Sequence, residues 1–445
     1  MSVPRPLAVD LFAGAGGLSL GFEQAGFDVA AAVEVDPIHA ATHEFNFPLG
    51  TSICASVADL SGADIRKRSG IEKREVAVVV GGAPCQGFSL IGKRVLDDPR
   101  NALVREFVRI VSELDAHAFV FENVKGLTVG RHKAFLYELI EAFEAKGYEV
   151  RQPWKVLNAV DFGVPQSRER LILMGVKRGE RLPDYPMPIT IAAGREGTEE
   201  RPAGPSCKDA LNDLPNADEF GTLLKSDAVR TKRFDMPSRY AAELRCMSND
   251  AWHYGHPRIW EPEVLTSSAR TVHTMISRTR FAEIEPGTVE PISRFYRLPP
   301  DGVSNTLRAG TDGARGAFTS PRPIHYAHPR CVTVREMARL HGFPDWFRFH
   351  GTKWHGARQI GNAVPPPLAR AVAEKVRDAL ECKATRPTEA VALGDEALLS
   401  LIMSEAALHF GVPTPSGRRD RKSGAKKRRQ ADIERDRLAA RAMNG

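Results

Sequence analysis

Short apolar runs rich in β-branched residues recur along the first 180 residues of the chain. The clearest of these runs cover residues 7–12, 29–33, 76–80, 118–121 and 171–176. Runs of this length, bounded by glycine or polar residues, are typical of buried strands in a parallel sheet. Between them, apolar residues at helical spacing predict helices over 18–24, 105–114 and 135–146. This alternation of strands and helices predicts an α/β fold.

The pattern changes after residue 177. As far as about residue 330, Pro, Gly, Arg and Ser are frequent and hydrophobic periodicity is poor, which indicates a second, loop-rich domain inserted into the first. Order returns at Thr333, where Glu336 three residues later predicts a helix that begins with a capping box. Two more helices are expected over 366–380 and about 395–410. The predicted units are 1–180, the inserted domain 181–330, the returning part 331–383, and a C-terminal helix with a basic tail at 384–445.

A cysteine follows the central predicted strand. The run 76–80 ends in Gly-Gly-Ala-Pro, and Cys85 comes directly after it. Open α/β sheets place their ligand sites at the carboxyl ends of strands. A thiol there is a nucleophile if backbone N–H groups or a nearby cation lower its pKa. The alternative is a buried structural cysteine, but a packing cysteine does not need so much special backbone around it.

Charged residues adjoin two further predicted strands. Glu122 follows the run 118–121, so its carboxylate is expected at the same sheet edge, beside Cys85. Arg168 and Arg170 lie one residue apart at the start of the run 171–176, and such a pair is expected to point to the same side. Ion pairing at a strand end or on the surface is the alternative for all three residues.

A glycine-rich turn, Phe-Ala-Gly-Ala-Gly-Gly at 12–17, joins the first strand to the first helix. Glu34 ends the second strand, 20 positions after Gly14, as in nucleoside-binding folds. A carboxylate there can accept hydrogen bonds from both ribose hydroxyls, although a solvated strand end is the alternative. The turn departs from the dinucleotide-binding fingerprint, because Ser19 stands where the third glycine would be.

The positive charge of the chain is concentrated in one segment. The formal net charge is +7, and residues 418–429 hold eight Lys or Arg against one Asp, so the rest of the chain is close to neutral. Such a run is typical of a solvated tail that adds salt-sensitive attraction to phosphates.

Cysteine usage and hydropathy limit the class of protein. The six cysteines are scattered without a C-x-x-C pair, which argues against a disulfide framework or a zinc site and for a reducing compartment. Neither an apolar signal region nor a membrane-spanning apolar stretch is evident. At 445 residues and 48.9 kDa, a cytoplasmic protein of two or three domains, without metal or membrane partner, is expected.

Five motifs in order resemble those of the DNA cytosine-5 methyltransferases. They are Phe12-Ala13-Gly14-Ala15-Gly16-Gly17, Pro84-Cys85-Gln86, Glu122-Asn123-Val124, Gln166-Ser167-Arg168-Glu169-Arg170 and Gly361-Asn362-Ala363-Val364-Pro365. The resemblance covers roughly residues 7–176 and 332–380, and the interval between is where this family carries its target-recognition domain. Five motifs in family order and at compatible spacing are a specific signal.

The resemblance implies a Rossmann-like, doubly wound, mostly parallel sheet and a role for each matching residue. Cys85 would be the nucleophile, Glu122 the cytosine-binding acid, and Arg170, with Arg168 beside it, the cation that holds the base. The residues implied to line the S-adenosylmethionine pocket are Phe12, Gly14, Gly16, Glu34, Asp59, Pro84 and Asn362. The chain departs from the family at 58–60, where it has Ala-Asp-Leu and the family often has Gly-Asp-Ile.

The implied activity is methyl transfer from S-adenosylmethionine to carbon 5 of a cytosine flipped out of a specific short sequence in duplex DNA, through a covalent Cys85 adduct. The implied setting is the bacterial cytoplasm, where a monomer acts on double-stranded DNA, associates with the nucleoid when bound, and is accompanied by a restriction endonuclease for the same site. Two alternatives remain: the same chemistry on transfer RNA, and a non-catalytic DNA-binding protein. The interval of about 155 residues before Val332 argues against the first, and the intact Cys85 and Glu122 against the second.

Overall fold

One large sheet organises the part of the chain that the computed structural model describes, residues 4–84, 101–128, 132–311 and 321–415. Its strand order is β3-β2-β1-β4-β5-β8-β6, with β7 paired to β8. The strands are β1 (Leu7–Leu11), β2 (Asp28–Glu34), β3 (Thr51–Cys54), β4 (Val76–Gly81), β5 (Ala118–Val124), β6 (Tyr148–Val150), β7 (Lys155–Asn158) and β8 (Glu169–Lys177). β1 to β5 pair in parallel, whereas β8 runs antiparallel to β5, β6 and β7. The predicted mostly parallel, doubly wound sheet is therefore confirmed.

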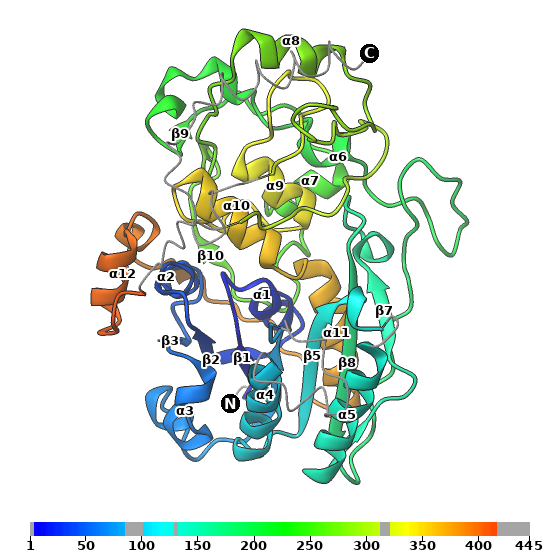
Figure 1. The fold of residues 1–445 in the computed structure, drawn as a ribbon, viewed down its shortest axis with the longest axis vertical. Coiled ribbons are helices and arrows are strands. Elements are labelled where there is room, and N and C mark those ends of the chain that lie inside the picture. The colour runs from blue at the N-terminus through cyan, green and yellow to red at the C-terminus, as the bar shows by residue number, and fades with distance from the viewer. Residues whose placement is uncertain (1–3, 85–100, 129–131, 312–320, 416–445) are drawn as a thin grey trace, which may run out of the picture.

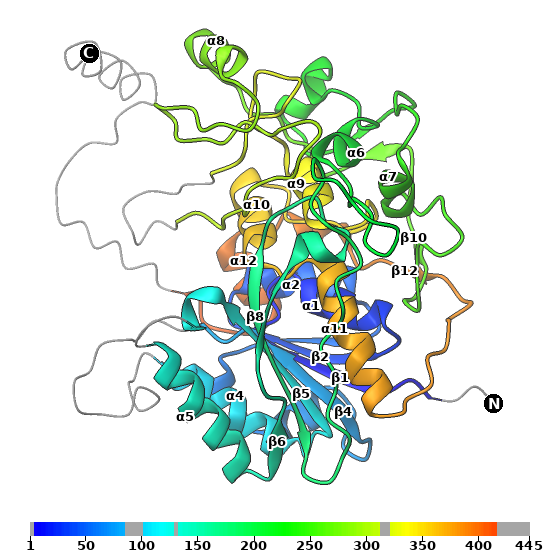
Figure 2. The ribbon, with the colours of Figure 1, turned by 90° about the vertical axis from the view of Figure 1, so that its right-hand side faces the viewer.

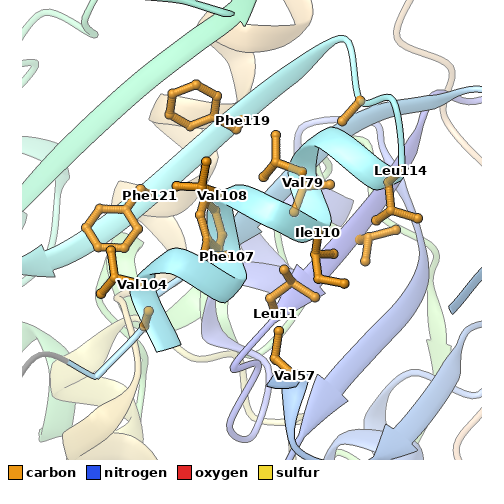
Figure 3. Packing of buried hydrophobic residues seen from close by; sticks show 14 of the residues in the cluster. Leu11, Val57, Val79, Val104, Phe107, Val108, Ile110, Leu114, Phe119 and Phe121 are labelled. Atoms are coloured by element: carbon orange, nitrogen blue, oxygen red, sulfur yellow. The ribbon is translucent and has the colours of Figure 1, made fainter. Parts of the chain in front are cut away.

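Helices cover both faces of this sheet (Figure 2). The helices on one face are α3 (Gly62–Arg68), α4 (Ala102–Glu113) and α5 (His132–Ala145), and those on the other are α1 (Gly17–Gln24) and α11 (Pro366–Ala379). Successive strand residues point to opposite faces, so Val79 packs with α4 whereas Val78 and Val80 pack with α1 and α11. Figure 3 shows the first of these cores, where Phe107 of α4 meets Phe121 of β5.

Two glycines let α1 and α11 cross at very short range. A Cβ atom built on Gly21 would lie 2.3 Å from the Cβ of Ala369, and one built on Gly17 would lie 2.4 Å from the carbonyl oxygen of Val364. Both distances are shorter than real Cβ contacts, so only glycine fits at these positions. This crossing seats the returning helix α11 on the sheet beside the glycine-rich turn.

Gly21→Ala is expected to destabilise the fold by about 1–3 kcal/mol, because the added methyl group forces α1 and α11 apart. Denaturant unfolding followed by circular dichroism measures the change. Gly221→Ala is the matched control, since a Cβ atom at Gly221 meets nothing within 4 Å. Equal stability of the two variants would show that the helix crossing tolerates the extra volume.

The described residues of the loop-rich interval form only short helices and strands. They are α6 (Cys207–Leu211), α7 (Arg239–Leu244), α8 (Met275–Glu283), β9 (Val229–Arg230), β10 (Arg258–Ile259) and β11 (Val264–Leu265). Its core is shared with α9 (Val334–His341) and α10 (Lys353–Asn362), which lie in the upper half of Figure 1, whereas α11 returns to the sheet. The predicted returning part, 331–383, therefore packs partly against the loop-rich interval and partly against the sheet. The domain boundaries themselves remain a prediction.

Two helix ends test the predictions made from capping patterns. The predicted capping box of α9 is present, with Thr333 and Glu336 bonded reciprocally and Gly342 ending the helix in the left-handed region at φ 83°. The single helix expected over 395–410 is instead a 3-10 turn, η9 (Glu396–Leu399), followed by α12 (Met403–His409). The helix breaks because the Leu401 carbonyl accepts a hydrogen bond from His350 Nε2 at 3.1 Å and Ile402 is extended.

Candidate active site

A cavity of about 580 Å³ opens at the carboxyl ends of β1, β2 and β4. β1 and β4 are neighbours in the sheet, and the strand order reverses between them, which is where doubly wound sheets bind ligands. The predicted residues that line the cavity are Phe12, Gly14, Glu34, Pro84, Asn362 and Glu122. In the described part of the chain, no three His, Cys, Asp or Glu side chains gather closely enough to hold a metal ion.

The glycine-rich turn forms one end of the cavity. Phe12 and Gly14 both adopt positive φ angles, 62° and 59°, and for a phenylalanine this conformation is strained. A Cβ atom at Gly14 would project into open space, whereas one at Gly16 would lie 2.3 Å from the ring of Phe47. Gly16 was expected to line the cavity, but it does not. It lets the turn pack closely against the residue that follows α2 (Pro37–Asn46).

Glu34 is fixed by the backbone at the cavity wall. Its Oε2 accepts a hydrogen bond from the Gly14 N–H at 2.8 Å, and its Oε1 accepts one from the Asp36 N–H at 2.9 Å. Each carboxylate oxygen has a second lone pair. The half-buried carboxylate is thus oriented by the protein and can still accept further hydrogen bonds.

The structure does not place Asp59 at the cavity. The chain enters a 3-10 turn, η1 (Val57–Asp59), soon after β3, and Asp59 at the end of this turn is exposed. Ala55, Ser56 and Val57 form the wall instead. The Ser56 hydroxyl accepts a hydrogen bond from the Ala58 N–H at 3.3 Å, which starts the turn and carries Asp59 away.

Glu122 and Arg170 form an ion pair at the edge of the cavity. Arg170 Nε lies 2.7 Å from Glu122 Oε1. Glu122 lies opposite Ile172 in the antiparallel β5–β8 pair, so Arg170 is its diagonal neighbour. Glu122 is 9% exposed, and burial raises its pKa while Arg170 and Arg168 oppose the shift. The arrangement brings together a carboxyl group of raised pKa and the guanidinium predicted to act beside it.

Arg168 does not share the position of Arg170. It is fully buried, and its guanidinium donates hydrogen bonds to the carbonyl oxygens of Leu307, Gly361 and Ala363 at 2.8–2.9 Å. Arg168 precedes the first residue of β8, so the alternation of side chains along a strand does not apply to it. The structure therefore gives Arg168 a positioning role: it holds the backbone on both sides of Asn362, at the cavity.

The backbone that follows β4 passes close to the Glu122 carboxylate. A Cβ atom on Gly82 would lie 2.6 Å from Glu122 Oε2, so a side chain at position 82 would displace the carboxylate. The Asn123 side chain donates to the Ala83 carbonyl oxygen at 2.8 Å and joins the ends of β4 and β5. The next residue in the chain after Pro84 is Cys85, which lies outside the described residues.

Other cavity residues escaped the sequence analysis. They are Val35, Asp36 and His39 at the start of α2, Leu103 of α4, and Arg358 and Gln359 of α10. Asp36 carried a signal, since an Asp before a Pro marks a helix start, and its side chain caps α2 by accepting from the Ile38 N–H at 3.0 Å. Arg358 and Gln359 carried none, because they lie just before the motif that begins at Gly361 and belong to no recognised pattern.

Comparison with known proteins identifies the family. The family model for C-5 cytosine-specific DNA methylases matches residues 8–378. The chain belongs to this family. It is therefore a DNA (cytosine-5-)-methyltransferase, which confirms the family and the enzyme class expected from the five motifs.

Individual relatives of this methylase span nearly its whole length. It is 56% identical over 408 residues to the type II methyltransferase M.XorII of Xanthomonas oryzae pv. oryzae, covering 92% of this chain and 93% of the relative. It is 35% identical over 374 residues to M1.HphI of Haemophilus parahaemolyticus, with 83% and 86% covered. The solved structure of an E. coli prophage protein described as a DNA modification methyltransferase has a TM-score of 0.67 and 32% identity over 84% of this chain and 99% of that one. The methylase thus resembles enzymes of bacterial restriction-modification systems.

Proposed function

We propose that this methylase modifies carbon 5 of a cytosine that is flipped out of a specific short sequence in duplex DNA, and that the reaction passes through a covalent Cys85 adduct. The observation that carries the proposal is the cavity shared by Glu34 and Glu122. One carboxylate is held by backbone N–H groups as a nucleoside site requires, and the other is buried beside a guanidinium. A nucleoside cofactor and a nucleobase therefore have matched binding groups within one cavity.

S-adenosylmethionine is the proposed cofactor, and the cavity fits it. Its ribose hydroxyls match the free lone pairs of Glu34, and the open space in front of Gly14 leaves room for its uncharged adenosine or its methionine part. When bound, the cofactor supplies a methyl group activated by a sulfonium. Phe12, Gly14, Glu34, Pro84 and Asn362 are the residues proposed to hold it.

Cys85 is the proposed nucleophile. The described cysteines are Cys54, Cys207, Cys246, Cys331 and Cys382, and all are free thiols. Burial raises the pKa of each of them, so none is poised as a thiolate. Pro84, the neighbour of Cys85, lines the cavity, and this position supports Cys85 as the attacking thiol.

Glu122 and Arg170 are proposed to prepare the base for attack. Carbon 5 of cytosine is a weak nucleophile until a thiolate adds to carbon 6 and turns the ring into an enamine. Glu122 donates a proton to ring nitrogen 3, and its raised pKa favours the protonated form that does so. Arg170 then binds the oxygen at carbon 2. Once carbon 5 is methylated, loss of its proton to a base such as water lets the Cys85 thiolate leave.

Double-stranded DNA is the proposed substrate. Carbon 5 is out of reach inside a stacked duplex, so the base must be flipped out at a cost of about a few kcal/mol. We assign the reading of flanking bases to the inserted domain, 181–330. A monomeric enzyme and a companion restriction endonuclease that acts on the same site complete the proposal. Among the residues that the structure describes, no helix is long and apolar enough to cross a membrane.

Transfer of a radiolabelled methyl group to duplex DNA or to transfer RNA tests the substrate. We expect label in the DNA alone, and bisulfite sequencing of DNA from expressing cells should show methylated cytosine within one short sequence. Label in transfer RNA alone would replace DNA with RNA as the substrate. Binding to DNA without label in either would favour a non-catalytic protein.

Glu34→Gln is expected to weaken S-adenosylmethionine binding by about 10- to 100-fold, since one ribose acceptor is lost and the amide NH₂ faces a backbone N–H donor. Isothermal titration calorimetry measures the affinity. Asp59→Asn is the matched control, because Asp59 is exposed and outside the cavity. If Asp59→Asn lost as much affinity as Glu34→Gln, Asp59 would belong to the cofactor site after all.

A further inference from the structure

The segment that follows α11 lies against the outside of the cavity wall. We call residues 384–412 the C-terminal strap. It contains β12 (Val391–Ala392), which pairs with β10, and then η9 and α12. The strap lies beyond residue 378, where the family match ends. Figure 1 shows α12 of the strap beside α2, and the two helices are in contact.

The strap covers the outer face of α2. Ala41 and Phe45, one turn apart on α2, pack with Leu398 and Leu399 of the strap in one buried apolar cluster. The Gly394 N–H donates to the Phe45 carbonyl oxygen at 2.9 Å. α2 has ten residues, and an isolated helix of fewer than about 12–15 residues is marginal in water. α2 therefore depends on its packing partners, and the strap is one of them.

The strap also holds the loop that leads into α10. The Gly351 N–H donates to the Leu399 carbonyl oxygen at 2.8 Å, and His350 Nε2 donates to that of Leu401 at 3.1 Å. The backbone N–H of His350 in turn donates to Gln359 Oε1 at 3.0 Å. Leu399 thus contacts α2 through its side chain and the α10 loop through its backbone.

α2 and α10 form one continuous wall of the cofactor cavity. Asp36 and His39 of α2 line it, as do Arg358 and Gln359 of α10. Gln359 Nε2 donates to Thr42 Oγ1 of α2 at 2.8 Å, so the two helices are bonded directly behind the lining residues. Whatever displaces one helix changes the shape of the cavity.

We propose that the C-terminal strap is a positioning element for S-adenosylmethionine: Leu399 holds α2 and α10 at the separation that the cofactor requires. The inference rests on the proposed function, which places the cofactor in this cavity. The strap acts on the cofactor cavity and makes no contact with Glu122 or Arg170. Its loss therefore affects cofactor binding and leaves the chemical step unchanged.

The test compares purified full-length Leu399→Ala and Leu399→Val with the wild type on a cognate DNA duplex. We expect Leu399→Ala to raise the KM for S-adenosylmethionine by about tenfold, with Leu399→Val between it and the wild type. The kcat at saturating cofactor is expected to stay unchanged. Leu139→Ala on α5 is the control, since Leu139 is fully buried in the core on the other side of the sheet. It should lower the melting temperature but leave the KM as it is.

Two results would overturn the inference. One is an unchanged KM in Leu399→Ala, and the other is an equal rise in Leu139→Ala, which would mark a general effect of lost stability. The Glu34→Gln variant distinguishes a failure of the positioning inference from a failure of the proposed function. If Glu34→Gln weakens binding while Leu399→Ala does not, only the positioning role is wrong. If neither variant affects the cofactor, the cavity is not its site, and both proposals fail.

Discussion

Cys85→Ala is expected to abolish methyl transfer to DNA, a loss of about 10⁴-fold or more, as is typical when a covalent nucleophile is removed. Cofactor binding should survive, because the thiol attacks the base and the groups proposed to bind the cofactor are untouched. DNA binding should survive too, since a smaller side chain leaves more room for a flipped base. Methyl transfer, cofactor titration and DNA binding are measured on the same preparation, and Cys85→Ser should behave in the same way.

Trapping of the enzyme on DNA that carries 5-fluorocytosine tests the assignment directly. Once carbon 5 of 5-fluorocytosine has been methylated, the fluorine cannot leave as a proton does. The thiol adduct then cannot break down, so in the presence of S-adenosylmethionine the wild type should remain covalently attached. Cys85→Ala should form no such adduct. Cys382→Ala is the control, since this free thiol lies away from the cavity and its pKa is raised by burial. Trapping that persists in Cys85→Ala would assign the nucleophile to another residue.

The position of the cavity was predictable because it depends on strand direction alone. Runs of β-branched residues gave β4 and β5, since a strand covered on both faces needs apolar residues at successive positions. Parallel strands end at one edge of the sheet, so Glu34 and Glu122, each placed at the end of a predicted strand, meet there. The glycine-rich turn could be placed for the same reason.

Packing between distant segments was not predictable from local patterns. Asp59 was assigned to the cavity by its resemblance to a motif, but the turn at Ser56 directs it outward. Arg168 was paired with Arg170 by strand alternation, yet it bonds to carbonyl groups up to 195 residues away. The predicted helix over 395–410 is broken by a contact with His350, 51 residues from Leu401. The errors at Arg168 and at 395–410 arose where a tertiary contact overrode the local pattern, whereas Asp59 is directed outward by a local turn that the motif did not indicate.

Resemblance and structure contribute different parts of the site. The motifs assign roles to Glu122 and Arg170, whereas the structure adds that the two are paired at 2.7 Å and that burial raises the Glu122 pKa. The ion-paired strand end that stood as the alternative for Glu122 is therefore present, and it is compatible with the chemical role. The Arg170 guanidinium compensates the charge of the buried Glu122 carboxylate.

Glu122→Gln is expected to lower the rate of methyl transfer by about 10²- to 10⁴-fold, the usual contribution of a general acid. Glutamine keeps the size of the side chain and one hydrogen bond to the base, but it cannot protonate ring nitrogen 3. Affinity for DNA and for the cofactor should change far less, because the cavity keeps its shape. Glu169→Gln, at an exposed position one residue from Arg170, is the control and should remain active.

The pH dependence distinguishes proton donation from simple base binding. A group that donates a proton acts below its pKa, so the single-turnover rate of the wild type should fall as pH rises through the Glu122 pKa, which burial shifts upward. In Glu122→Gln the rate should be low at every pH, and its fall with rising pH should disappear. Single-turnover assays at saturating DNA and cofactor measure both properties. A variant with near-normal turnover and the same pH profile as the wild type would remove Glu122 from the mechanism and leave it as the buried partner of Arg170.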